Sequence, residues 1–217
     1  MSDAVLLDRD GVINQLVFFP DLGIIDSPLN PAQVKLMRGA AEAIQLFNRL
    51  GLKVIVVSNQ PAIAKGKMSE GLFEKVRLKV KTLLEKKGAH LDAEYYCFHH
   101  PHAKRPEFKA VCDCRKPKPG LILQAKQDFG LDTSKCYMIG DGLTDIEAGH
   151  AAGCKSILIG DVKCDICKLM ETRAVKPDII ASSLLAVSKI IEKEVSGKME
   201  ISIDTTSVKE IIRKEFS

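Results

Sequence analysis

The chain has 217 residues, 46% hydrophobic and 5% aromatic, with a formal net charge of +4. This length and apolar content predict one domain with a sizeable core. No apolar run approaches the roughly 20 residues that cross a bilayer. The N-terminal segment lacks the basic region followed by an apolar stretch that marks a secretion signal. Lysine and arginine are spread along the chain rather than clustered as in nucleic-acid-binding proteins. We therefore expect a cytoplasmic protein with neither a membrane nor a nucleic-acid partner.

Short apolar runs alternate with helical patterns along the chain. Buried parallel strands read as continuous apolar segments, which predicts strands at 5–7, 54–57, 95–98, 137–139, 156–159 and 178–180. End signals such as Asn30-Pro31 and Gly51 predict helices over 30–50, 69–87, 118–129 and 144–152. This alternation is typical of an α/β fold with a doubly wound, Rossmann-like and mostly parallel sheet.

Residues 1–195 are expected to form this domain, and residues 196–217 a polar extension. The extension contains Ser207-Val208-Lys209-Glu210, a capping box that predicts a short amphipathic helix.

The first predicted strand runs directly into Asp8 and Asp10, which are followed by Gly11. Alternate residues of an extended segment point the same way, so both carboxylates can face a site at the carboxyl end of the sheet, where open α/β sheets bind ligands. Gly11 permits a sharp turn and a close approach to a ligand. The pair is suited to a nucleophile, an acid/base and part of a metal site, and taken alone it also fits a solvated acidic turn.

Three further strand regions end in polar groups: Ser58-Asn59-Gln60, Arg115-Lys116-Pro117 and the segment 140–145. Each alone fits a strand-end cap or a surface charge, but their succession at one edge of a sheet predicts a phosphoryl-transfer site. A phosphate dianion repels an anionic nucleophile, so Asp8 can attack only if cations such as Mg²⁺ and Lys116 offset the charge.

These residues resemble the motifs of the haloacid dehalogenase superfamily of aspartate-nucleophile phosphatases, over residues 4–160 and with all four motifs in order. Segments 8–14, 58–60 and 112–117 are similar to the branch of heptose-bisphosphate and histidinol-phosphate phosphatases. The resemblance implies a phosphoric monoester hydrolase with a nearly capless active site, which works through an aspartyl-phosphate.

The resemblance also implies roles for the carboxylates. Asp8 would be the nucleophile and Asp10 the acid/base, with Mg²⁺ on Asp8, the backbone carbonyl of Asp10, and Asp141. Asp145 is the alternative metal carboxylate and is expected to orient metal waters or Lys116.

The remaining motif residues are implied to contact the phosphate or the sugar. Ser58 and Lys116 would neutralise the phosphoryl oxygens. Substrate contacts are expected from Arg9, Asn59, Gln60 and Arg115. Position 142 holds glycine where the heptose branch often has lysine, which removes one candidate phosphate or metal-shell contact.

A second cluster of metal-binding residue types lies in mid-chain, among seven cysteines whose odd number disfavours a disulfide scaffold. Three thiolates and one imidazole form a closed tetrahedral zinc set, and reduced core cysteines are the alternative. The resemblance implies a structural zinc loop over 97–114, ligated by Cys97, His99, Cys112 and Cys114, with His100 and His102 outside the set. Because Arg115-Lys116 follows the last ligand, zinc would also place the phosphate-binding cations.

The substrate stays open at this point. A zinc loop longer than that of the histidinol-phosphate branch favours D-glycero-D-manno-heptose 1,7-bisphosphate, dephosphorylated at position 7. The segment 15–28 departs from the substrate loop of the better-known heptose enzymes, which leaves histidinol phosphate and other small sugar phosphates as alternatives. A nucleic-acid-binding module with a relict site is the remaining possibility, disfavoured because all the core residues are present.

Overall fold

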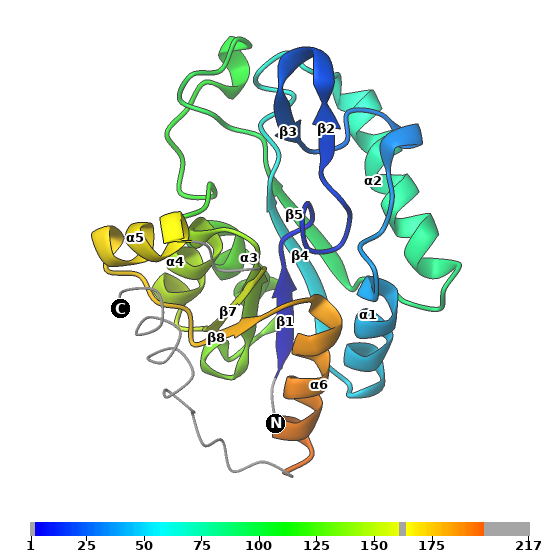
Figure 1. Ribbon diagram of the computed structural model, residues 1–217, viewed down its shortest axis with the longest axis vertical. Coiled ribbons are helices and arrows are strands. Elements are labelled where there is room, and N and C mark those ends of the chain that lie inside the picture. The colour runs from blue at the N-terminus through cyan, green and yellow to red at the C-terminus, as the bar shows by residue number, and fades with distance from the viewer. Residues whose placement is uncertain (1–2, 161–163, 198–217) are drawn as a thin grey trace.

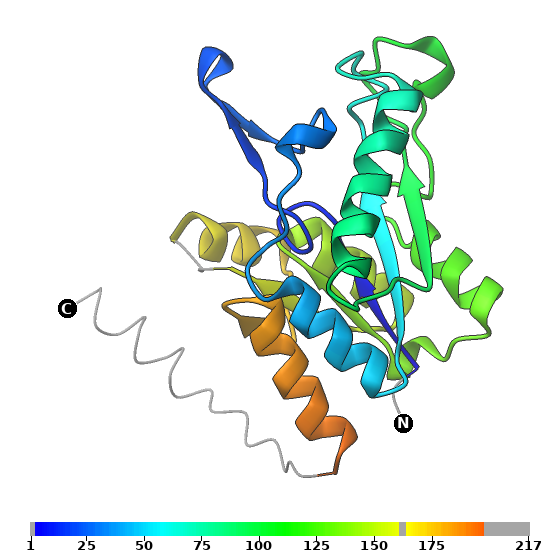
Figure 2. The ribbon, with the colours of Figure 1, turned by 90° about the vertical axis from the view of Figure 1, so that its right-hand side faces the viewer.

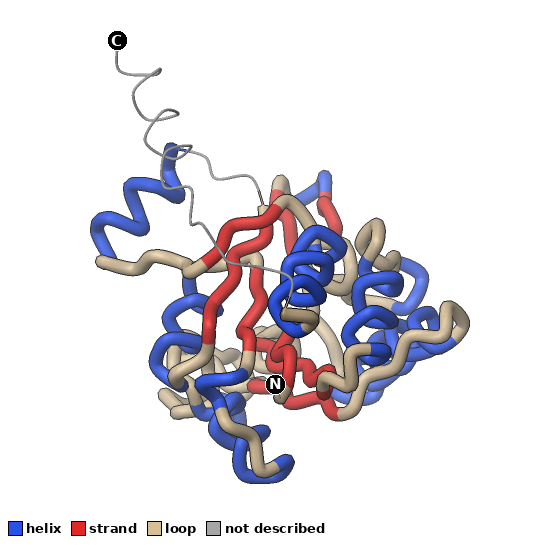
Figure 3. Tube along the Cα trace, turned by 90° about the horizontal axis from the view of Figure 1, so that it is seen from below, coloured by secondary structure: helices blue, strands red, loops and turns tan. Residues whose placement is uncertain are grey.

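A six-stranded parallel sheet forms the centre of the computed structural model, which describes residues 3–160 and 164–197 (Figures 1 and 3). Its strand order is β5-β4-β1-β6-β7-β8, with every neighbouring pair parallel. The strands are β1 (Ala4–Leu7), β4 (Lys53–Asn59), β5 (Ala93–Cys97), β6 (Tyr137–Gly140), β7 (Lys155–Ile159) and β8 (Ile179–Ala181). The six predicted strands and the doubly wound, Rossmann-like fold are confirmed.

Helices cover both faces of this sheet. One face packs against α1 (Ala40–Arg49), α2 (Glu70–Glu85) and α6 (Leu184–Val195), and the other against α3 (Gly120–Phe129) and α4 (Leu143–Ala152). Beyond α4, α5 (Cys164–Arg173) packs through Met170. Successive side chains of a strand point to opposite faces, so Val5 and Leu7 enter one core while Leu6 enters the other. None of the described helices combines the length and hydropathy that a bilayer crossing requires.

The helix predicted over 30–50 is wrong in its first half. Asn30 accepts hydrogen bonds from the backbone N–H groups of Ala32 and Gln33, but it caps only a 3₁₀ turn, η2 (Pro31–Gln33), and α1 begins at Ala40. In between, Gln15 N–H donates to Lys35 O and Met37 N–H donates to Ile13 O. Backbone pairing with the loop after Asp10 therefore overrides the helical pattern and fixes that loop.

The other three predicted helices are confirmed as α2, α3 and α4, each within a few residues of its expected ends. The segment 15–28 contains an antiparallel hairpin of β2 (Val17–Phe19) and β3 (Ile24–Asp26), joined by the turn η1 (Pro20–Leu22). In Figure 2 this hairpin rises beyond the carboxyl ends of the central strands, opposite α2 and the 99–118 loop. The helix expected within 207–216 lies outside the described residues.

Candidate active site and metal cluster

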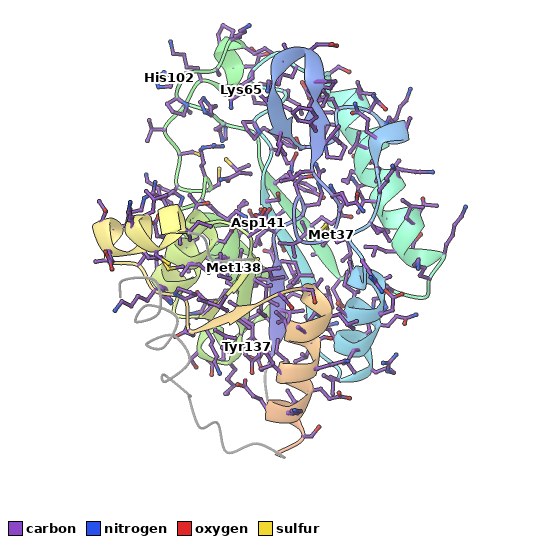
Figure 4. The ribbon with its side chains drawn as sticks, viewed as in Figure 1. Met37, Lys65, His102, Tyr137, Met138 and Asp141 are labelled. Atoms are coloured by element: carbon purple, nitrogen blue, oxygen red, sulfur yellow. The ribbon has the colours of Figure 1, made fainter. Side chains whose placement is uncertain are left out.

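The carboxyl ends of β1 and β6 bring three carboxylates together. Leu7 and Ile139 are partners in register, so Asp8 and Asp141, just beyond these two strands, are neighbours. Asp145 joins them from the first turn of α4, and one oxygen of each carboxylate lies within 4.8 Å of the others. Figure 4 shows Asp141 near the middle of the molecule, whereas Tyr137, at the start of β6, lies lower in the view.

Two glycines make room for these carboxylates. At Gly11, whose φ is +82°, a Cβ atom would lie 2.0 Å from Oδ2 of Asp141. At Gly140 it would lie 2.2 Å from Cγ of Asp145. No side chain fits at either position, because real Cβ atoms do not approach other atoms so closely. The bare backbone after Asp10 therefore permits the packing of Asp141 against the first motif.

Lys116 supplies the central positive charge. It is 3% exposed, and its Nζ lies 3.1 Å from Oδ1 of Asp8 and 2.5 Å from Oδ1 of Asp145. Burial alone would lower the pKa of Lys116, but the charges of Asp145 and Asp8 outweigh burial and raise it. The backbone of Lys116 is fixed by the Asn59 amide, which donates to Lys116 O at 3.0 Å and accepts from Lys116 N–H at 3.0 Å.

One lysine leaves the carboxylate group short of positive charge. Burial and the charges of Asp8 and Asp145 raise the pKa of Asp141 to about 7. Burial raises the pKa of Asp145 to about 6, against the opposing charge of Lys116. A bound cation would relieve this repulsion, and carboxylate oxygens are the hard donors that Mg²⁺ prefers. The residues present therefore fit a magnesium site.

Asp10 is held by three side chains in the wall of the site. Its Oδ1 accepts from Asn14 Nδ2 at 2.8 Å, and its Oδ2 accepts from Gln60 Nε2 at 2.6 Å and Arg9 Nη2 at 3.0 Å. Gln60 Nε2 also lies 3.1 Å from the Ser58 hydroxyl, to which it donates. Arg9, Gln60 and Ser58 are each 1% exposed. Asn14 belongs to the motif segment 8–14, but no role for it is predicted from the sequence.

The predicted zinc ligands also meet. The three cysteine sulfurs lie 3.1–3.5 Å apart, and His99 Nδ1 lies 3.4 Å from Cys114 Sγ and 3.9 Å from Cys97 Sγ. A tetrahedral zinc with bonds of about 2.3 Å separates its ligand atoms by about 3.8 Å, so the chemistry and spacing of these donors fit zinc. His100 and His102 are not members of this ligand group.

The zinc cluster and the carboxylate site share a short stretch of chain. Arg115, half-buried, donates from Nη1 to His99 O at 3.3 Å. Lys116 follows it directly, and Asn59, which fixes Lys116, is the register partner of Cys97. The metal-binding cluster therefore adjoins the cation of the site through two neighbouring elements.

Basic and imidazole side chains lie close together on the neighbouring loops. Burial and the nearby charges of Lys65, Arg115 and His102 lower the pKa of His100. The His100 and His102 rings lie 5.9 Å apart, and Lys65 and His102 are marked in Figure 4 above Asp141. Lys104 N–H donates to Ala64 O at 2.8 Å, which ties the 99–118 loop to the loop that carries Lys65.

Comparison with known proteins finds a family model and several similar enzymes. A family model described as HAD-hydrolase-like matches residues 113–187. The D-glycero-beta-D-manno-heptose-1,7-bisphosphate 7-phosphatase of Escherichia coli K12 is 38% identical over 149 residues, covering 69% of this chain and 74% of the relative. The enzyme of the same name from Pasteurella multocida is 36% identical over 159 residues, covering 73% and 82%.

A solved structure agrees with these sequences. The D,D-heptose 1,7-bisphosphate phosphatase of B. bronchiseptica, complexed with magnesium and phosphate, superposes with a TM-score of 0.73 at 25% identity. The match covers 88% of this chain and 99% of that one.

Proposed function

Since this chain belongs to the haloacid dehalogenase-like phosphatases, in the family that contains the heptose-bisphosphate enzymes, we propose that it removes the 7-phosphate of D-glycero-D-manno-heptose 1,7-bisphosphate. The chain is a phosphoric monoester hydrolase. The observation that carries the proposal is the meeting of Asp8, Asp141, Asp145 and Lys116 within hydrogen-bond or metal-ligand distance of one another.

In the proposed mechanism, Asp8 attacks phosphorus and forms an aspartyl-phosphate, while the bond from phosphorus to the sugar oxygen breaks. Asp10 gives its proton to the departing oxygen and then takes one from the water that hydrolyses the aspartyl-phosphate. Asp8, Asp141 and the backbone carbonyl of Asp10 would hold Mg²⁺, which would supply positive charge to offset that of the phosphate. Lys116 and Ser58 bind the phosphoryl oxygens.

The neighbouring side chains support this arrangement. Asn59 holds the backbone of Lys116, and Gln60 links Asp10 to Ser58. Cys97, His99, Cys112 and Cys114 would hold zinc in a structural role, because four protein ligands would leave no open position for a reacting water.

The loop cations favour a substrate with a second phosphate. Lys65 and Arg115 lie close to His100 on the loops beside the site, where the anionic end of a bisphosphate would be attracted. Histidinol phosphate carries an ammonium group at its far end, and these charges would repel it. Positive potential therefore argues for the bisphosphate and against the alternative substrate.

The cellular setting proposed for this enzyme is the cytoplasm. A three-cysteine zinc set needs reduced thiols, which that compartment maintains. The proposed partner is a small phosphorylated sugar, with no nucleic acid or membrane.

The test measures phosphate release in the presence of Mg²⁺ from both anomers of heptose 1,7-bisphosphate and from histidinol phosphate, with Asp8→Asn as the blank. Preference for one heptose anomer supports the proposal. Preference for histidinol phosphate would reassign the substrate, and no turnover dependent on Asp8 would refute the phosphatase mechanism.

A further inference from the structure

Arg9 stands between the two aspartates of the first motif and has the largest fully buried side chain among the residues that the structure describes. Only 1% of the residue is exposed. A buried guanidinium is costly unless charges and hydrogen bonds compensate for its lost hydration. The partners of Arg9 therefore indicate what the buried charge is used for.

Those partners are the acid/base carboxylate and the residue beside it. Nη2 of Arg9 lies 3.0 and 3.2 Å from the two oxygens of Asp10, and Nε lies 3.4 Å from Oδ1. Nη2 also donates to Gln60 Oε1 at 2.9 Å, and Gln60 Nε2 returns to Asp10 at 2.6 Å. A planar guanidinium fork fixes a carboxylate in both distance and orientation. Arg9, Gln60 and Asp10 thus form a closed triangle.

Two aromatic rings hold Arg9 itself. Its Cζ lies 5.4 Å from the ring centroid of Phe73 on α2 and 5.7 Å from that of Tyr96 on β5. Nη1 of Arg9 is buried and makes no hydrogen bond to any part of the chain that the structure describes. Ring faces can take the place of such a partner, since they attract a cation within about 6 Å.

The rings are themselves anchored. Phe73 and Tyr96 meet edge to face, with centroids 5.0 Å apart. The Tyr96 hydroxyl donates to Glu94 at 2.5 Å, and Arg77 donates to the same carboxylate at 2.8 Å. The support for Asp10 therefore reaches from the active site to the outer edge of the sheet.

We infer that Arg9 is a positioning residue, which fixes the acid/base carboxylate of Asp10 and is itself fixed by the rings of Phe73 and Tyr96. This inference rests on the proposed function, in which Asp10 moves the proton. The sequence predicts that Arg9 contacts the substrate, and this inference replaces that role. The side-chain hydrogen bonds of Arg9 go to Asp10 and Gln60, and its ring contacts go to Phe73 and Tyr96.

The inference is tested with Arg9→Met, Arg9→Lys and Phe73→Leu, and with Arg49→Met as the matched control, an exposed arginine at the end of α1. On heptose bisphosphate, Arg9→Met should lower kcat by about 10- to 100-fold, a part of what proton transfer and orientation contribute. KM should stay within about twofold, because no substrate contact is lost. Arg9→Lys should lose nearly as much, since lysine keeps the charge but not the fork. Phe73→Leu should lose less, because Tyr96 remains.

A second substrate separates proton transfer from general damage. The nitrophenolate of p-nitrophenyl phosphate leaves without an acid, so the first step should be spared in Arg9→Met while hydrolysis of the aspartyl-phosphate stays slow. A burst of nitrophenol equal to the enzyme concentration is then expected in Arg9→Met. Thermal melting identifies any variant that is unfolded at the assay temperature. If the Arg9 variants are unfolded, the kcat and the burst are measured in Phe73→Leu, which leaves the charges in place.

The outcomes are distinct. A fall in kcat with a steady KM, together with the burst, supports the inference. A raised KM with unchanged kcat would make Arg9 a substrate ligand and overturn it, as would wild-type rates in all three variants. If the wild type hydrolysed neither heptose bisphosphate nor p-nitrophenyl phosphate through Asp8, the proposed function would fail, and this inference would fail with it.

Discussion

The molecule has two metal-binding clusters of opposite character, only a few residues apart. In the first, the carboxylates of Asp8, Asp141 and Asp145 face one lysine, and Asp141 is the most exposed residue of the three. In the second, three sulfurs and one ring nitrogen lie within 4.8 Å of one another and supply the four donors of a closed tetrahedral set. An open, partly hydrated set of hard oxygens suits an ion that must bind phosphate. A closed thiolate set suits one that only holds the chain.

The two clusters are nevertheless coupled. Cys114 ends the zinc set, and Lys116, two residues later, carries the charge of the reactive site. The open site has a buried cation whose place depends on the Asn59 amide and on this short link. The closed Cys/His cluster thus anchors Lys116 in the open carboxylate site. Three experiments test these different roles of the two clusters.

Lys116→Met should have the largest effect. It leaves Asp8 and the buried Asp145 without their cation, and breaking a buried ion pair costs about 3–5 kcal/mol. Loss of the fixed positive charge at the transferring phosphoryl group should lower kcat by about 10³-fold or more. Phosphate release and urea unfolding measure the two effects.

Lys118→Met is the matched control for that variant, because Lys118 pairs with the exposed Asp113 outside the site. It should keep wild-type rates. Activity within tenfold of wild type in Lys116→Met would mean that the phosphoryl charge is neutralised elsewhere.

Loss of zinc should come second. In Cys114→Ser the cluster loses one of its four donors, and we expect the melting temperature to fall by about 10 °C or more. Because Lys116 loses its anchor, kcat should fall about tenfold. Calorimetry, metal analysis and phosphate release give the three readings.

Cys167→Ser is the control, since Cys167 is an exposed free thiol away from the cluster. Wild-type melting and rates in zinc-free Cys114→Ser would separate the two clusters and make the loop a passive insertion.

The fold could be predicted where local pattern and tertiary structure agree. Strands such as 54–57 are buried on both faces, so their apolar runs mark them directly. The 30–50 helix failed because Ile13 and Gln15 pair with the backbone of 34–39, a long-range contact that no helical periodicity records. The 17–26 hairpin escaped notice because both of its strands have only three residues.

The site follows the same rule. Asp8, Asp10, Ser58 and Asp141 stand at or just beyond strand ends, where topology alone brings them together. Contrary to the prediction from the sequence, Lys116 does not follow a strand directly but lies on the long loop between β5 and α3. Phe73 and Tyr96 could not be predicted, since they belong to α2 and β5 and read as ordinary core residues. Their meeting with Arg9 depends on how helix and sheet pack, which motif spacing does not encode.

The smallest expected effect is the change in stability with pH that the ionisation of Asp141 causes. The pKa of Asp141 is raised from 3.8 to about 7, so between these values the folded chain binds a proton that the unfolded chain has released. The Mg²⁺-free protein should therefore lose stability as the pH rises from about 4 to about 7. Asp141→Asn removes this ionisation, and without Mg²⁺ it should melt a few degrees higher than wild type at pH 8 and nearly equal to it at pH 5.

Mg²⁺ should reverse that order. Added Mg²⁺ stabilises the wild type more at pH 8 than at pH 5, because the ion must displace the proton at the lower pH. Asp141→Asn should respond weakly at both values while its phosphate release is lost. The zinc cluster serves as the internal reference, since its metal content should stay constant in both proteins. An equal Mg²⁺ shift in wild type and variant would place the ion away from Asp141, and the difference between an open and a closed metal cluster would then need another basis.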